Sequence, residues 1–315
     1  MIMGLSPLDF PLLDSETRKD ASRMRFIFAF ICGLFFLSLT FNSAGAEEEK
    51  YTLRYRFHPG ETLHWNVEHR SLVRTTVSGT TQTAETVSIS EKVWRVKEVK
   101  PDGAATFEHM VEWVDMRQKL AGNSEVCYDS RTDAKPPMGF EDVAASVGVP
   151  ISVITMDARG KILRREQKGS KGVAANEGAI TIPLPGEPIS VGHVWTFPCE
   201  IDVPLESGGI KKIKAVQQFK LDSVKTGVAS IHVATQIISP VTEPAIEAQV
   251  AQRESTGVVR FDIDAGRIIG QQMDVDKHVV GFRGQASSLH YVTRFSEQWI
   301  PETAKSAAKP APALQ

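Results

Sequence analysis

The chain has 315 residues, of which 42% are hydrophobic and 23% are charged, and its formal net charge is -2. These values are ordinary for a folded protein and exclude a disordered, collagen-like or multi-span membrane protein. The near-neutral charge gives no electrostatic signature of nucleic-acid binding, so we expect no nucleic-acid partner. Three cysteines are too few for a small disulfide-stabilised domain.

Residues 1–46 are predicted to form a signal peptide region. An uncharged apolar run from Phe26 to Phe41 follows Arg23 and Arg25 and precedes a group of small residues that ends at Ala46. This arrangement is typical of a secretory signal, so we expect cleavage after Ala46. The run is shorter than the ~20 residues of a spanning helix, which disfavours a retained membrane anchor.

The first 22 residues are mixed in charge and precede an otherwise compact signal, so Met24 is an alternative start of translation. We expect the mature chain to be exported, either periplasmic or secreted, with no transmembrane span.

The mature chain predicts many strands with regular turns. Apolar and polar residues alternate from Tyr51 to Phe57, and a Thr- and Val-rich stretch from Thr80 to Lys100 stops at Pro101-Asp102-Gly103, a turn signal. Later segments repeat this pattern: Ile210–Val224, Val228–Ser239, Val258–Ile263 and Ser287–Trp299. The predicted fold class is all-β, mainly an antiparallel sandwich or barrel.

One segment has a helical period instead. Phe140, Val143, Ala144 and Val147 follow the spacing i, i+3, i+4, i+7, which predicts a short amphipathic helix inserted near 139–147. Residues 169–188 are rich in Gly and Pro and are expected to form a linker, and residues 302–315 are an Ala/Pro/Lys tail that we expect to be disordered.

Parts of the sequence resemble one another in the same order. The residues around Val99 resemble those around Val224, and the segment around Asp157 resembles the segment around Asp264. The stretch 60–65, which ends at Trp65, resembles 192–195. Such similarity predicts two related β units, 51–168 and 189–299. Chance is the alternative, because β-hairpins share turn chemistry.

Signatures of catalysis are missing from the sequence: we find no nucleophile elbow, phosphate loop, zinc-protease motif or dinucleotide fingerprint. His64 and His69 are separated by an odd number of residues, so a regular strand would point them to opposite faces. Two aspartate pairs, Asp262/Asp264 and Asp274/Asp276, could serve a carboxylate-dependent hydrolase, but they are better explained as surface and turn residues. We therefore expect no catalytic, cofactor-binding or metal-binding residues.

Two further groups of residues leave alternatives open. In an exported protein Cys127 and Cys199 could form a disulfide, or they could remain free thiols. Trp65, Trp113 and Trp195 lie on predicted strands and are candidate ligand contacts, although strand tryptophans more often pack in a core or at its rim.

The stretch from Phe57 to Glu61, the Gly192–Trp195 segment and the repeated hairpins resemble a family of uncharacterised secreted, β-rich bacterial envelope proteins. The resemblance implies no catalytic residues. At the level of the fold, the chain is also similar to lipoprotein-carrier (LolA-like) half-barrels, in which a curved sheet and a helical lid enclose an apolar groove. The inserted helix fits that architecture.

These observations favour a non-enzymatic structural or protein-interaction module of the cell envelope. The alternative is a carrier or binding protein for an apolar ligand in a β vessel, which would need an enclosed apolar cavity of at least ~300 Å³. A hydrolase is the least favoured hypothesis. The expected partner is an envelope component or an apolar ligand, and we expect no cofactor.

Overall fold

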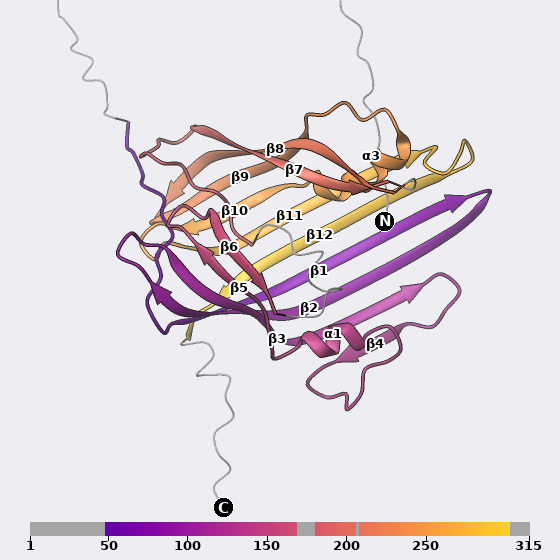
Figure 1. Cartoon of the computed structure of the whole chain (residues 1–315), viewed down its shortest axis with the longest axis horizontal. Helices are drawn as coiled ribbons and strands as arrows, with labels where there is room; N and C mark the ends of the chain where they lie inside the picture. Colours follow the sequence, from indigo (N-terminus) through magenta and orange to yellow (C-terminus); the bar gives the residue numbers. More distant parts are fainter. Residues whose placement is uncertain (1–47, 169–179, 206–207, 303–315) are drawn as a thin grey trace, which may run out of the picture. The chain divides into compact units, whose positions relative to one another are not determined.

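The structure is a computed structural model that describes residues 48–168, 180–205 and 208–302 (Figure 1). The described residues between Glu49 and Glu302 belong to one compact unit. The predicted signal peptide with Met24 and Ala46, residues 169–179 of the predicted linker, and the tail after Glu302 lie outside the described residues.

The strands form one antiparallel sheet of 12 strands that is not closed, which confirms the all-β prediction. The hydrogen-bonded order is β6-β5-β3-β2-β1-β12-β11-β10-β9-β8-β7, and β4 pairs with β3 beside this path. The strands of the N-terminal half are β1 (Thr62–Val77), β2 (Thr80–Val99), β3 (Ala105–Leu120), β4 (Val126–Asp129), β5 (Pro150–Met156) and β6 (Ile162–Gln167). The strands of the C-terminal half are β7 (Val194–Pro204), β8 (Ile210–Lys225), β9 (Val228–Ile237), β10 (Thr256–Asp262), β11 (Arg267–Val280) and β12 (Ser288–Ile300).

Because β1 pairs with β12 along almost its whole length, both halves of the chain share this one sheet. In place of the expected sandwich or barrel, the strands form a single open sheet, whose free edges are β6 and β7.

Alternation along β1 defines the two faces of the sheet. Leu63 and Trp65 point to one side of the strand and are buried, whereas Asn66 points to the other side and is exposed. We call the side of Leu63 and Trp65 the inner face and the side of His64 and Asn66 the outer face. Since paired residues point to the same side, the registers extend both faces across the sheet.

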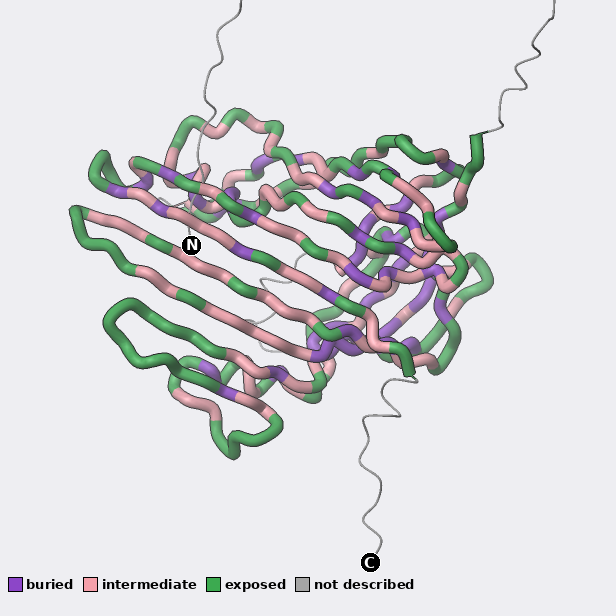
Figure 2. Tube along the Cα trace, turned by 180° about the vertical axis from the view of Figure 1, so that it is seen from behind, coloured by how far each residue is buried: buried purple, intermediate pink, exposed green. Residues whose placement is uncertain are grey.

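The main hydrophobic core lies on the inner face at one end of the sheet. It combines Phe107 of β3 and Ile154 of β5 with Phe219 of β8 and Phe261 of β10, all of which are fully buried. Strands near opposite edges thus contact one cluster, so the sheet curls around it. Figure 2 shows the buried residues gathered at this end. Aromatic contacts are close, with the ring centroids of Trp94 and Phe107 4.4 Å apart.

The alternating segment 51–57 was predicted as a strand, and this prediction is wrong. Apart from one bridge between Tyr51 and Ile189, the segment has no strand pairing. It runs between two hairpin turns instead: the amide of Tyr55 donates to the carbonyl of Ala158, and the amide of Arg56 donates to that of Gly266. Its alternation reflects the burial of every second side chain in the core, which an extended segment can achieve without joining the sheet.

Part of the described stretch of the predicted linker is packed in the core, although 186–188 are exposed. Ile182 and Leu184 are each no more than 6% exposed and belong to the main core, as does Ile189, which directly follows the predicted linker. Tyr55 helps to fix this segment, because its hydroxyl accepts from the amide of Ile182 at 3.1 Å.

The hairpins that the sequence matched share local geometry. Pairing shifts between Val96 and Glu98 in β2, and it shifts between Leu221 and Ser223 in β8, 125 residues later (221 − 96). The amide of Gly60 donates to the carbonyl of Val96, just as the amide of Gly192 donates to that of Leu221. Each half also contains a helix: α1 (Glu141–Ser146) follows β4, the fourth strand of its half, and α3 (Pro244–Val250) follows β9, the third strand of its half.

The predicted helix near 139–147 is confirmed as α1. Its apolar positions Phe140, Val143, Ala144 and Val147 pack with Val114 and Tyr128. Neither α3 nor the 3₁₀ turn Ala251–Arg253 that follows it was predicted from the sequence. A proline at the start of α3 and the spacing of Ile246 and Val250 were the available signals.

Candidate functional site

One row of inner-face residues crosses the sheet just beyond the main core. In register, this inner row consists of Met116, Ser88, His69, Phe295, Met273, Gly257, Val233, Phe219 and Trp195. Phe219 and Val233 are buried, whereas Met116, Phe295 and Met273 are partly exposed. The centre of the row therefore retains apolar surface that the described residues do not cover.

The adjacent row on the inner face is rich in hydroxyl and amide groups. This hydroxyl row contains Gln118, Thr86, Ser71, Thr293 and Val275, and near the β7 edge Thr235, Gln217 and Phe197. The Thr293 hydroxyl donates to the carbonyl of Arg70 at 2.9 Å and lies 2.7 Å from Nε2 of His69. Apolar and hydrogen-bonding groups thus lie side by side on the same surface.

Both helices pack on the inner face. The α1 cluster rests on Val114 of β3. Near the β7 edge of the sheet, Ile246 and Val250 of α3 pack on Val203 of β7 and Ile213 of β8. Ala248 of α3 also packs with Val279 and Leu289 of β11 and β12. The helices therefore cover parts of the inner face on either side of its centre.

Among the described residues, the pocket that borders the main core is too small for a ligand. The enclosed space beside Lys92, Glu297 and their aromatic neighbours measures about 10 Å³, about enough for a single water molecule. An ion pair borders this space: Nζ of Lys92 lies 2.5 Å from Oε1 of Glu297 and 4.4 Å from the ring centroid of Trp65. Any ligand on the inner face must lie beyond this core.

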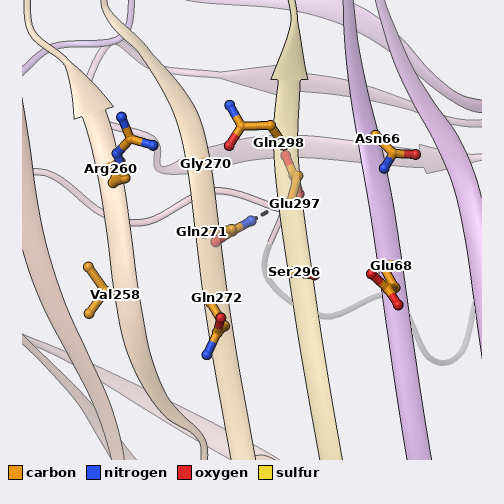
Figure 3. Close-up of a pocket in the computed structure, with 10 residues that line it drawn as sticks. All are labelled: Asn66, Glu68, Val258, Arg260, Gly270, Gln271, Gln272, Ser296, Glu297 and Gln298. Atoms are coloured by element: carbon orange, nitrogen blue, oxygen red, sulfur yellow. Dashed lines mark hydrogen bonds between the residues drawn. The ribbon is translucent and has the colours of Figure 1, made fainter.

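A larger hollow of about 420 Å³ lies on the outer face (Figure 3). Its lining residues come from β1, β10, β11 and β12: Asn66, Glu68, Val258, Arg260, Gly270, Gln271, Gln272, Ser296, Glu297 and Gln298. Gly270 opens the floor because it has no side chain, and a Cβ there would lie 3.0 Å from Oε1 of Gln298. In Figure 3 the Gln271 side chain turns away from the hollow toward Glu297.

Eight of the ten residues that line the hollow have polar side chains, and some of these already form hydrogen bonds within the protein. The Gln298 amide donates to the carbonyl of Ile269 at 2.8 Å, and the Gln272 amide donates to Asp274 at 2.8 Å. The lining has no aromatic side chain. It therefore suits water or a small polar solute better than an apolar chain.

The three candidate tryptophans occupy different environments. Trp65 is 1% exposed and its indole donates to the carbonyl of Ile268 at 3.0 Å, so it is a core residue. Trp195 stacks on Phe219 at the end of the inner row. Trp113 lies on the outer face, where its indole donates to Oε2 of Glu91 at 2.8 Å.

The cysteines are both free, so the disulfide considered from the sequence is not formed in the structure. Cys127 is exposed in β4 beside β3, and Cys199 lies in the edge strand β7. β4 belongs to the N-terminal half and β7 to the C-terminal half, and the two strands lie at separate places in the sheet.

The carboxylates considered from the sequence stabilise turns and surface pairs. Asp262 accepts a hydrogen bond from the amide of Ala265, and Asp274 pairs with Arg294 at 2.7 Å. Arg267, which follows the Asp262/Asp264 turn, pairs with Glu61 at 3.3 Å. The histidine prediction is confirmed: His64 lies on the outer face, and His69 lies on the inner face.

The buried His109 is expected to make the stability of the folded protein depend on pH. Burial, followed by the charges of Lys92 and Arg165, lowers the pKa of His109 from its ordinary value of 6.5 to about 3. Between these values the unfolded chain binds a proton that the folded chain does not, so stability falls as the pH falls from about 6.5 toward 3. The expected contribution is up to ~1.4 kcal/mol per pH unit.

The measurement is urea unfolding at several pH values for the wild type and His109→Gln. The variant should show a shallower loss of stability across this range. Identical slopes in the two proteins would contradict the assignment.

Comparisons with known proteins give little beyond this geometry. No family model matches the chain, and no curated protein matches it. Among solved structures, a lipovitellin structure described by its lipid–protein interactions is 12% identical with a TM-score of 0.43, and the match covers 82% of this chain and 27% of that one. DynF from the dynemicin biosynthesis pathway of Micromonospora chersina is 9% identical with a TM-score of 0.21, covering 82% and 89%. Both TM-scores are below 0.5, so we infer nothing from these likenesses.

No helix among the residues that the structure describes is long and apolar enough to cross a membrane.

Proposed function

We propose that this protein is an exported, non-enzymatic binding protein that holds an amphipathic, lipid-like ligand against the inner face of its sheet. The observation that carries the proposal is the partly exposed centre of the inner row, Phe295 and Met273, next to the hydroxyl row. An apolar chain along the inner row would be removed from water, and a polar end could hydrogen-bond to Ser71 or Thr86.

The placement of the helices supports this proposal. We infer that the two halves are related units, because their pairing shifts and turn contacts correspond and each half contains a helix between strands. Each unit then contributes one helix to the inner face. A pair of helices that flank a partly exposed sheet surface is a suitable frame for a ligand.

The filled core changes the form of the original carrier hypothesis. A ligand enclosed in a vessel would need at least ~300 Å³, far above the space of about 10 Å³ beside Lys92. The proposed ligand therefore lies on the open inner face. The alternative of a structural or interaction module predicts no saturable ligand binding there.

The test is titration of the full mature chain with a fluorescent long-chain fatty acid. Phe295→Asp places a charge at the centre of the inner row and should weaken binding at least ~10-fold. Val292→Asp is the matched control, because Val292 lies on the outer face of the same strand and is also partly exposed. It should leave the affinity within about twofold.

Circular dichroism must show that both variants fold, and Phe295→Ala replaces Phe295→Asp if the charged variant does not. Equal affinities of the two folded variants would overturn the proposal. Absence of saturable binding in the wild type would favour the interaction module.

A further inference from the structure

Three side chains from three adjacent strands meet on the outer face. They are His64 of β1, Glu91 of β2 and Glu112 of β3. One ligand atom from each residue lies within 4.8 Å of the others. Nδ1 of His64 is 2.7 Å from Oε1 of Glu91 and 3.6 Å from Oε2 of Glu112. We call this group the His64 cluster.

An irregularity in the sheet creates the cluster. Glu91 pairs with Trp113 and Lys92 pairs with Val111, so Glu112 is an extra residue in β3. In regular pairing Glu112 would point away from the face that carries Trp113. The bulge turns its carboxylate toward His64, in the way that bulges redirect side chains at functional sites.

The distances match what a metal ion requires. Bonds of about 2.0–2.1 Å in tetrahedral geometry separate ligand atoms by about 3.3 Å. The two His64 distances, 2.7 and 3.6 Å, lie on either side of that value. Coordination requires the His64–Glu91 separation to widen by about 0.6 Å and the Glu112 carboxylate, on a side chain that is 44% exposed, to approach by about 0.3 Å.

Charge and burial also favour a cation. Glu91 and His64 are 9% and 13% exposed, and a second carboxylate faces the same imidazole. Two carboxylates beside one imidazole gather negative charge where water is scarce, which a divalent ion offsets. Glu112 is the most exposed of the three ligands, so its side of the cluster gives an ion an entry route and leaves a coordination position for water.

A supporting residue orients the central ligand. The Trp113 indole donates to Oε2 of Glu91 at 2.8 Å, so Oε1 is directed to His64. The Arg131 guanidinium lies 4.0 Å from the Trp113 ring centroid and also binds Asp129, which fixes the indole. Ligands held by hydrogen-bonded neighbours in this manner are typical of metal sites.

We propose that the His64 cluster binds one zinc ion through Nδ1 of His64 and the carboxylates of Glu91 and Glu112. The donor set decides the class of metal. One imidazole nitrogen with two carboxylate oxygens suits Zn²⁺, whereas Ca²⁺ and Mg²⁺ prefer oxygen ligands alone. Three protein ligands leave the fourth position open. This site is independent of the proposed inner-face ligand, because it lies on the opposite face.

The experiment is calorimetric titration of the metal-free full mature chain with zinc chloride, together with melting curves. The wild type should bind one Zn²⁺ per chain, and its Tm should rise with added zinc. His64→Ala and Glu112→Gln should lose saturable binding and the shift in Tm. Trp113→Phe should bind about 10- to 100-fold more weakly.

His290→Ala is the matched control. His290 also contacts a carboxylate, Asp276 at 2.8 Å, but it belongs to no cluster of three ligands among the described residues. This variant should bind zinc like the wild type. The proposal is overturned if the wild type binds no zinc at 1:1 stoichiometry, if His64→Ala binds as well as His290→Ala, or if Ca²⁺ or Mg²⁺ binds more tightly than Zn²⁺.

Discussion

Replacement of Lys92 by methionine is expected to lower the free energy of unfolding by about 3–5 kcal/mol. Lys92 and Glu297 are 8% and 5% exposed, and their charges lie 2.5 Å apart. The Lys92 ammonium also lies over the rings of Trp65 and Trp94, at 4.4 and 4.8 Å. In the variant the Glu297 carboxylate would remain buried with Gln271 as a donor, at 3.0 Å, but without its cation.

The measurement is urea unfolding followed by tryptophan fluorescence and circular dichroism. The double variant Lys92→Met/Glu297→Leu should regain most of the lost stability, since neither charge is then buried. Lys97→Met is the control for an exposed pair: Lys97 is 53% exposed and lies 3.0 Å from Glu108. That change should cost less than about 1 kcal/mol. Similar losses in the two single variants would refute the special role of the buried pair.

Replacement of Gly160 by alanine is the second change with a large expected effect. Gly160 has a φ of +85°, and an added Cβ would lie 2.4 Å from the carbonyl oxygen of Ile182 and 2.6 Å from Cε2 of Tyr55. Tyr55 is 3% exposed and hydrogen-bonded to Ile182, so neither neighbour can move aside cheaply. We expect a loss of about 1–2 kcal/mol from the left-handed backbone and about 1–3 kcal/mol more from overpacking.

Gly122→Ala separates the two contributions. Gly122 has nearly the same φ, +82°, but an added Cβ would meet no atom within 4 Å. This variant should lose only the backbone part. Thermal or urea unfolding of both variants gives the comparison, and equal losses would show that the contact with Ile182 and Tyr55 does not matter.

The strands and turns of this protein could be predicted because their signals are local. The alternation of Leu63, Trp65 and Val67 can be recognised from neighbouring residues alone. A glycine such as Gly103, with a φ of +83°, indicates a turn whatever the rest of the chain does. The short helix α1 was visible for the same reason, since its apolar stripe lies within one segment.

The candidate sites were less accessible from the sequence. The inner row joins residues such as Met116 and Trp195 that share a face only because nine strands keep one register. The spacing of residues along one strand gives no information about the neighbouring strands, so the sequence does not connect His64 of β1 with Glu91 of β2 and Glu112 of β3. A bulge in β3 brings that cluster together, and the sequence around Glu112 carries no signal of it.

The sequence by itself determined the all-β class, most strand positions and the paired hairpins, because side-chain alternation and turn chemistry act over a few residues. Only the tertiary structure decided that β1 pairs with β12 in one open sheet, that segment 51–57 lies in the core without joining a strand, and where the inner and outer faces place their side chains. These features depend on pairing between distant segments, and a slip of one residue would move every side chain of a strand to the other face.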